Sequence, residues 1–148
     1  SKDMMPREKE VFEMMHRLIE EYKLEGRIRF VGHVAAHLLI PYYQNAGLFV
    51  MPSIFEPFGM TSQEAMACGT PVVASRYGGI RTVLTHGKDG ILIDPKDIDE
   101  FTDVMVRLLT DRAWRDQIGH AGCELARATF SWEAMADRHI DLYSHYSP

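Results

Sequence analysis

Hydrophobic residues along this chain follow two patterns, one helical and one continuous. In the helical pattern an apolar residue returns every three or four positions with charged residues between, as at Val11, Met15 and Leu18, which is the spacing of one helix face. In the continuous pattern a short apolar run ends at a glycine or proline, which predicts a buried strand. The expected helices cover residues 11–22, 36–45, about 62–68, around 80–85, 98–109, 114–125 and 132–143. The expected strands cover residues 28–31, 48–51, 71–74 and 91–93.

The alternation of short strands and helices predicts an α/β fold, a Rossmann-like parallel sheet with helices on both faces. Sheets of this kind bind ligands beyond the carboxyl ends of their strands. The loops that follow the first three expected strands are therefore candidate binding segments, at residues 32–34, 52–60 and 76–80. We expect residues 1–148 to form a single partial domain that ends in helices over residues 97–146.

The C-terminal helices carry stripes of aromatic and aliphatic residues at helical spacing. Stripes of this kind pack into a core in most proteins, and we expect the same here. Asp97 and Glu100 have the spacing of a capping box at the start of the first of these helices.

The segment from Pro52 to Glu64 holds the candidate chemistry. It leads from the end of an expected strand to the start of a helix, where free backbone N–H groups and the helix dipole favour a phosphate. Gly59 lets the backbone approach a ligand closely. Glu56 precedes this anion site and Glu64 follows it, and carboxylates accept hydrogen bonds from sugar hydroxyls. The arrangement is typical of a nucleotide-sugar pocket.

Each part of this segment also has a purely structural interpretation. Thr61 and Glu64 have the spacing of a capping box, in which Glu64 only stabilises its own helix. Glu56 is equally explained as a solvated loop carboxylate, and Gly78-Gly79 as a turn.

An ordered series of motifs adds a resemblance to a known family. The motifs are Pro52-Ser53, Glu56-Pro57-Phe58-Gly59, Glu64-Ala65-Met66-Ala67, Gly69-Thr70-Pro71-Val72-Val73-Ala74, Gly78-Gly79 and Gly90-x-Leu92-x-Asp94-Pro95. With them, residues 46–95 resemble the C-terminal domain of retaining glycosyltransferases of the GT-B fold, the group of sucrose synthase, sucrose-phosphate synthase and glycogen synthase. Two glutamates separated by seven residues are part of that group's pattern. The similarity extends over about residues 8–143.

The resemblance implies roles at the sugar end of a donor. Glu56, the residue expected at the catalytic centre, would contact the donor sugar hydroxyls near the reacting carbon. The backbone N–H groups of Phe58, Gly59 and Met60 would bind sugar hydroxyls and the distal phosphate.

It also implies roles at the nucleotide end. Thr61 and Ser62 would present the helix N-terminus to the diphosphate, and Glu64 would accept hydrogen bonds from the two ribose hydroxyls. Backbone groups at Gly32 and His33 would hold the edge of the base.

The reaction implied is transfer of a hexose from a nucleoside diphosphate sugar, with UDP-glucose favoured, to the hydroxyl of a sugar or sugar-phosphate acceptor. The family resemblance implies no metal and no cofactor, the nucleotide sugar being a substrate. It also implies partners that this sequence does not show: an N-terminal acceptor domain, and an Arg and Lys ahead of the matching region. The sequence also leads directly into a helical pattern with no strand ahead of it, so we expect a chain truncated at its N-terminus. With the acceptor domain missing, we expect it to be inactive by itself. The last helix, over residues 131–146, would cross to that other domain, which predicts partial exposure of Trp132, Tyr143 and Tyr146.

Two alternatives stay open. A phosphorylase or epimerase of the same fold is one, although no lysine stands in a context that fits pyridoxal phosphate. A non-catalytic Rossmann-like nucleotide-binding or interaction module is the other.

Composition narrows the partners. The 148 residues carry a net charge of −5, which disfavours nucleic acid because phosphate backbones bind basic surfaces. No apolar run reaches the roughly 18 residues of a membrane span. Cys68 and Cys123 lack metal-ligand spacing and are expected to be buried thiols, which fits a cytoplasmic protein.

Overall fold

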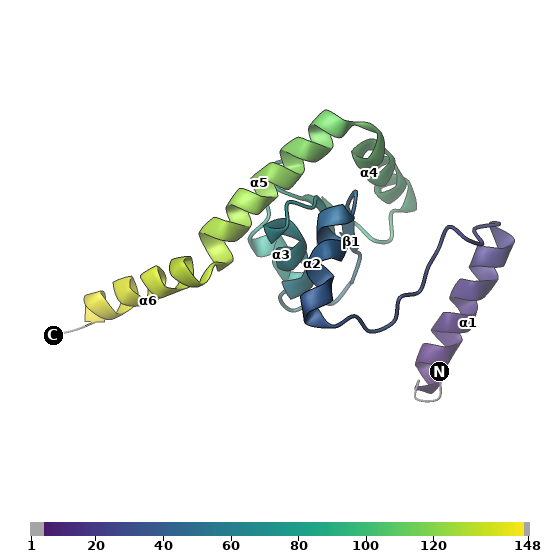
Figure 1. Cartoon of the computed structure of the whole chain (residues 1–148), viewed down its shortest axis with the longest axis horizontal. Coiled ribbons are helices and arrows are strands. Elements are labelled where there is room, and N and C mark those ends of the chain that lie inside the picture. Colours follow the sequence, from purple (N-terminus) through teal and green to yellow (C-terminus); the bar gives the residue numbers. More distant parts are fainter. Residues whose placement is uncertain (1–4, 147–148) are drawn as a thin grey trace. The chain divides into compact units, whose positions relative to one another are not determined.

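The computed structural model describes residues 5–146. The chain forms two compact units, residues 1–34 and residues 35–148 (Figure 1). That residues 1–148 act as one donor-binding domain stays a prediction.

The first unit is built on helix α1 (Pro6–Glu21). Proline suits the first helical position because its missing N–H has no intrahelical acceptor there. The Met5 N–H donates to the carboxylate of Glu8 at 2.7 Å and so caps the helix start. The predicted amphipathic helix is confirmed, with its bounds moved toward the N-terminus.

The prediction of a strand at residues 28–31 is wrong. Ile28, Phe30 and Val31 are each between 44% and 49% exposed, and the segment joins no ladder within residues 5–146. The Phe30 ring packs instead on two rings of α1, with centroids 5.1 Å from Phe12 and 5.2 Å from His16. An apolar run becomes a strand only where a neighbouring strand accepts its backbone hydrogen bonds.

The second unit contains a parallel three-stranded sheet in the order β1 (Phe49–Met51), β2 (Val72–Ser75), β3 (Ile91–Ile93). Val73 of β2 lies opposite Val50 of β1 on one side and Ile91 of β3 on the other. The strands predicted at 48–51, 71–74 and 91–93 are thus confirmed, and all three carboxyl ends meet at one edge of the sheet.

Helices connect and cover these strands. They are α2 (Ala36–Asn45), α3 (Met60–Ala67), the 3₁₀ turn η1 (Gly79–Thr82), α4 (Ile98–Thr110), α5 (Arg112–Phe130) and α6 (Trp132–Tyr146). The short helix expected around residues 80–85 is the 3₁₀ turn. Pro41 lies inside α2, where it removes one helical hydrogen bond.

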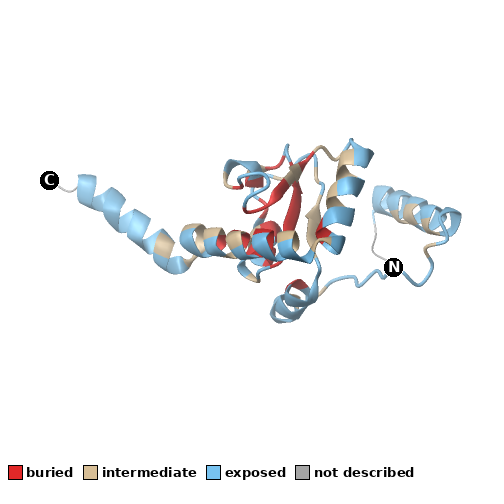
Figure 2. Cartoon of the chain, turned by 90° about the horizontal axis from the view of Figure 1, so that it is seen from above, coloured by how far each residue is buried: buried red, intermediate tan, exposed pale blue. Residues whose placement is uncertain are grey.

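Strands β2 and β3 are mostly buried (red in Figure 2), and apolar side chains pack on both faces of the sheet. Successive residues of a strand point to opposite faces, so Val72 and Ala74 of β2 join one core while Val73 joins the other. The first core contains Tyr43, Ala65, Met66, Val72, Ala74, Ile80, Leu84 and Ala126. The second contains Val73, Ile91, Ile93, Leu108 and Ile118. Helices therefore cover both faces, as the α/β prediction requires.

The capping box predicted at the start of α4 is half correct. Asp97 Oδ1 accepts the N–H of Glu100 at 2.9 Å, as a cap should. The Glu100 carboxylate does not return to Asp97; it accepts from Arg76 at 2.6 and 2.8 Å and from the Asp94 N–H at 3.0 Å. The guanidinium is the stronger partner because it carries charge and two N–H groups.

The predicted core stripe of the last helix is wrong, whereas the exposure expected for its aromatic residues is confirmed. No residue of α6 is buried within its described length, and Trp132 and Tyr146 are 82% and 81% exposed. The prediction of buried thiols is also wrong, since Cys68 and Cys123 are each partly exposed. Cys68 follows the end of α3, and Cys123 lies on α5, where its thiol donates to the Ala67 carbonyl at 3.4 Å.

Candidate functional site

The loop between β1 and α3 is closed on itself by Glu56. Oε1 of Glu56 accepts the backbone N–H of Gly59 at 3.1 Å. Gly59 is the N-cap of α3 and has a φ of +78°, a conformation that residues with a Cβ rarely adopt. Glu56 is half-buried, so the interpretation as a freely solvated carboxylate is wrong. The second carboxylate oxygen is left to accept a hydrogen bond from a ligand.

The loop after β2 holds the same segment from the other side. The Gly79 N–H donates to the backbone carbonyl of Glu56 at 2.6 Å. A Cβ on Gly79 would lie 1.9 Å from the carbonyl oxygen of Pro57, a distance that no side chain tolerates. Gly78-Gly79 is therefore more than the predicted turn, because the second glycine makes the close contact between the two loops possible.

The N-terminus of α3 opens between these loops. The N–H groups of Met60 and Thr61 have no protein acceptor within the described chain, as expected for the first positions of a helix. Both residues are exposed, so the two donors and the positive end of the helix dipole are accessible to an anion.

The two hydroxyl residues of this turn differ in position. Ser62 is fully buried, its Oγ lies 3.9 Å from the sulfur of Met51, and its N–H donates to the Gly59 carbonyl. Thr61 is exposed, and its hydroxyl lies 3.4 Å from the same sulfur. Of the two, only Thr61 presents its side chain at the surface.

Glu64 is oriented by α2 rather than by its own helix. Its Oε2 accepts the hydroxyl of Tyr43 at 2.9 Å. Thr61 is the second residue of α3 and not its N-cap, so the capping-box interpretation of Thr61 and Glu64 is wrong. The other oxygen of the Glu64 carboxylate is available to an external donor.

Tyr43 remains a hydrogen-bond donor over the whole physiological range. It is 8% exposed, and its burial, together with the hydrogen bond to Glu64, raises the pKa of Tyr43 to about 12. Burial penalises the charged phenolate, and the neighbouring carboxylate adds repulsion to that penalty. The sequence does not single out Tyr43, since nothing in the local pattern of residues 36–45 distinguishes its ring from those of other core residues.

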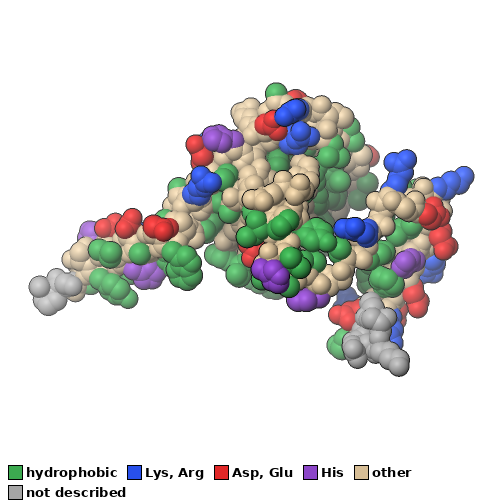
Figure 3. All heavy atoms as spheres, in the orientation of Figure 1, with side chains coloured by type: hydrophobic (Ala, Val, Ile, Leu, Met, Phe, Trp, Pro, Cys, Tyr) green, Lys and Arg blue, Asp and Glu red, His purple; other side chains and the backbone are tan. Residues whose placement is uncertain are grey.

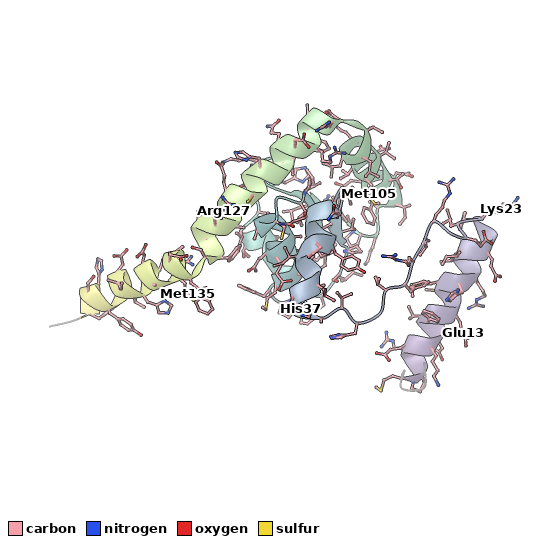
Figure 4. All side chains as sticks on the ribbon, in the orientation of Figure 1. Glu13, Lys23, His37, Met105, Arg127 and Met135 are labelled. Atoms are coloured by element: carbon pink, nitrogen blue, oxygen red, sulfur yellow. The ribbon has the colours of Figure 1, made fainter. Side chains whose placement is uncertain are left out.

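Glu64 lies between two surface grooves of the second unit. One, of about 340 Å³, runs between α2 and α3 past Tyr43 and Cys68. The other, of about 570 Å³, is bounded by α3, the end of α5 and the start of α6, where Met135 is marked in Figure 4. Phe58 lines this groove and packs edge-on against Phe130, with ring centroids 6.3 Å apart. The glutamate is therefore accessible from both sides of its helix.

The structure brings together most of the predicted site residues but not all of them. Glu56, Gly59, Met60, Thr61 and Glu64 occupy one loop and one helix turn of the second unit. Gly32 and His33 belong to the first unit, and their contact with a base stays a prediction. None of the helices within residues 5–146 combines the length and the apolar composition that a membrane-spanning helix needs.

Comparison with known proteins identifies a family. The family described as glycosyl transferases group 1 matches residues 8–124. The chain is 35% identical to sucrose synthase of Melioribacter roseus, over 94% of the chain and 19% of that protein.

Solved structures agree with this assignment. A sucrose-phosphate synthase from Thermosynechococcus elongatus has a TM-score of 0.79 at 39% identity, covering 89% of this chain and 33% of its own. Anabaena HepE in complex with UDP and glucose has a TM-score of 0.83 at 27% identity, covering 95% of this chain and 38% of its own. The chain thus spans between about a fifth and two fifths of these relatives. The predicted glycosyltransferase family and its Rossmann-like fold are confirmed.

Proposed function

The chain belongs to the group 1 glycosyltransferase family, and from this premise we propose that it is the donor-binding part of a retaining glycosyltransferase. The donor is a nucleoside diphosphate hexose, with UDP-glucose favoured, and the acceptor is the hydroxyl of a sugar or sugar phosphate. One observation carries the proposal: two carboxylates, Glu56 and Glu64, flank a helix N-terminus whose first N–H groups are free.

Each part of this arrangement matches one part of such a donor. The N–H groups of Met60 and Thr61 suit the diphosphate, because a helix N-terminus combines free donors with a favourable dipole. Glu64, fixed by Tyr43, has one oxygen left to accept ribose hydroxyls. Glu56, fixed by Gly59, has one oxygen left for a sugar hydroxyl. The relative crystallised with UDP and glucose supports UDP-glucose as the donor.

The chemistry follows from where charge develops. As the bond between sugar and phosphate breaks, negative charge collects on the leaving diphosphate and the sugar becomes oxocarbenium-like. N–H donors fixed before the reaction stabilise that charge more than they stabilise the bound donor, which lowers the barrier. Glu56 acts in this scheme by holding the sugar at the reacting centre and by its negative charge beside the developing cation.

The test is a calorimetric titration of the chain with UDP, ADP, GDP and UDP-glucose, with Glu64→Gln as the variant. A glutamine still accepts the Tyr43 hydroxyl, so the thermal stability should hardly change. The affinity for UDP should fall about ten-fold, because hydrogen bonds to a charged acceptor are the stronger ones.

Glu124→Gln is the matched control, since Glu124 is an exposed carboxylate of α5 outside both grooves. It should leave the UDP affinity unchanged. Equal nucleotide affinity in the parent chain and Glu64→Gln would contradict the proposed site. A preference for ADP or GDP would support the proposed site but would identify a donor with a different nucleotide.

A further inference from the structure

Residues 76–79, which lead from β2 to the 3₁₀ turn, are held from both ends. Their backbone contacts the loop of Glu56 on one side, through the Gly79 N–H and the Glu56 carbonyl. Their side chains contact the segment after β3 on the other side. These contacts link the end of β3 to the backbone of Glu56. Glu56 is the residue whose carboxylate the proposed function places at the donor sugar.

The anchor at the β3 end is a hydrogen bond between Tyr77 and Asp94. The Tyr77 hydroxyl donates to Oδ2 of Asp94 at 2.6 Å, and Oδ1 of Asp94 accepts the N–H of Lys96 at 2.9 Å. Short hydrogen bonds to an ionised carboxylate are stronger than neutral ones. The bond lowers the pKa of Asp94 and raises the pKa of Tyr77, so donor and acceptor keep their charge states around neutral pH.

Arg76 supplies a second anchor to the same segment. Its guanidinium donates to both oxygens of Glu100, at 2.6 and 2.8 Å, and its backbone N–H continues the β2–β3 ladder by donating to Ile93. The Glu100 carboxylate also holds the N–H of Asp94 at 3.0 Å. The Arg76 guanidinium is therefore paired with Glu100 and holds the loop in place. Its charge is not available to a phosphate.

The backbone of residues 77–79 connects these side-chain contacts to Glu56. The Tyr77 N–H donates to the hydroxyl of Ser75 at 3.1 Å, and the Gly78 N–H donates to the Ser75 carbonyl at 3.2 Å. Ser75 is buried at the end of β2. Because Gly79 touches Pro57 without space for a Cβ and donates to the Glu56 carbonyl, a shift of residues 77–79 either pushes against the Glu56 loop or breaks this hydrogen bond.

We propose that Tyr77, held by Asp94, is a positioning residue that fixes Glu56 for the sugar end of the donor. The inference rests on the proposed function. The role is confined to the sugar end of the site, because Glu64 is held by Tyr43 from α2 and its carboxylate forms no hydrogen bond with residues 76–79 in the described part of the chain.

The experiment compares UDP with UDP-glucose in the parent chain and in Tyr77→Phe. The phenylalanine keeps the ring and loses only the hydroxyl. The affinity for UDP should stay within about two-fold, while the additional affinity that glucose confers should fall about three- to ten-fold, as for one lost charge-assisted hydrogen bond. Amide hydrogen exchange of the Gly79 N–H, measured without ligand, should accelerate by a similar factor.

Two further variants make the result specific. Asp94→Asn keeps an acceptor oxygen for the Tyr77 hydroxyl and should restore much of the glucose-dependent affinity relative to Asp94→Ala. Tyr42→Phe removes the hydroxyl of an equally exposed tyrosine on α2 and should change neither readout. Either parental Gly79 exchange or a parental UDP-glucose to UDP affinity ratio in Tyr77→Phe would overturn the positioning role.

The outcomes also separate the two proposals. A parent chain that binds no UDP contradicts the proposed function, and unchanged Gly79 exchange in Tyr77→Phe contradicts the anchor without any ligand. If the parent chain binds UDP, and Tyr77→Phe leaves the additional affinity from glucose unchanged, the proposed function is retained. In that case Tyr77 has no role in positioning Glu56.

Discussion

Tyr43 and Glu64 are joined by a hydrogen bond of 2.9 Å between two helices on the same face of the sheet. They are 21 residues apart in sequence, and the bond fixes one oxygen of a carboxylate whose other oxygen faces solvent. A buried phenol that donates to an exposed carboxylate orients it at little entropic cost, because the ring itself is already ordered by the core. This contact, rather than helix capping, explains the conformation of Glu64.

The late ionisation of Tyr43 is the first prediction. Its folded-state pKa of about 12 lies above the value near 10 of an exposed tyrosine. The protonated phenol therefore contributes stability that is complete below about pH 10 and is lost as the pH rises through about 12. An ultraviolet titration of tyrosinate should show that Tyr43→Phe lacks the latest step.

Tyr42→Phe is the control for this titration and should retain that step. If Tyr43→Phe instead removed a step near pH 10, the hydrogen bond to Glu64 and the burial of the ring would both be in doubt.

A second prediction uses two adjacent glycines as a matched pair. In Gly79→Ala the new methyl group would meet the Pro57 carbonyl at 1.9 Å, so the loops must separate, at a cost of about 2 kcal/mol or more in unfolding free energy. In Gly78→Ala the nearest atom, Glu56 Cβ, is 3.5 Å away, and the backbone is extended, so the cost should be below about 1 kcal/mol. Urea unfolding of both variants gives the comparison.

Gly79→Ala should also weaken UDP-glucose binding more than UDP binding, because the displaced loop carries Glu56. Equal stability of the two alanine variants would show that the Gly79 backbone does not lie against Pro57.

A third prediction concerns the apolar side of α6. Hydrophobic side chains gather along one side of this helix and acidic ones along the other (Figure 3), and Trp132 and Tyr146 are more than four-fifths exposed. Exposed apolar surface of this kind favours association. Sedimentation velocity of the chain should show concentration-dependent self-association, and the double variant Trp132→Ser, Tyr146→Ser should reduce it.

Glu133→Gln, on the acidic side of the same helix, is the control and should leave association unchanged or slightly increased by reduced repulsion. A parent chain that stays monomeric at high concentration would remove self-association as a property of this surface.

Local pattern was sufficient for most elements of the second unit. The three strands at 48–51, 71–74 and 91–93 form within one residue of their predicted bounds, because each is a short apolar run closed by a turn residue and covered by helices. The same pattern failed at residues 28–31, since a strand also needs a neighbour and Phe30 finds its partners on α1. It failed for α6 as well, because an apolar stripe is buried only where another surface covers it.

The candidate site also has one part that the local sequence predicts and one part that it does not. The sequence alone determined which residues surround the helix N-terminus, because Glu56, Gly59 and Glu64 are close along the chain and helix geometry fixes their spacing. Only the tertiary structure decided what holds them. Tyr43 reaches Glu64 from another helix, and Gly79 reaches Glu56 from another loop. Such contacts depend on how the sheet brings distant segments to one edge, and no local pattern of hydrophobic and polar residues encodes that geometry.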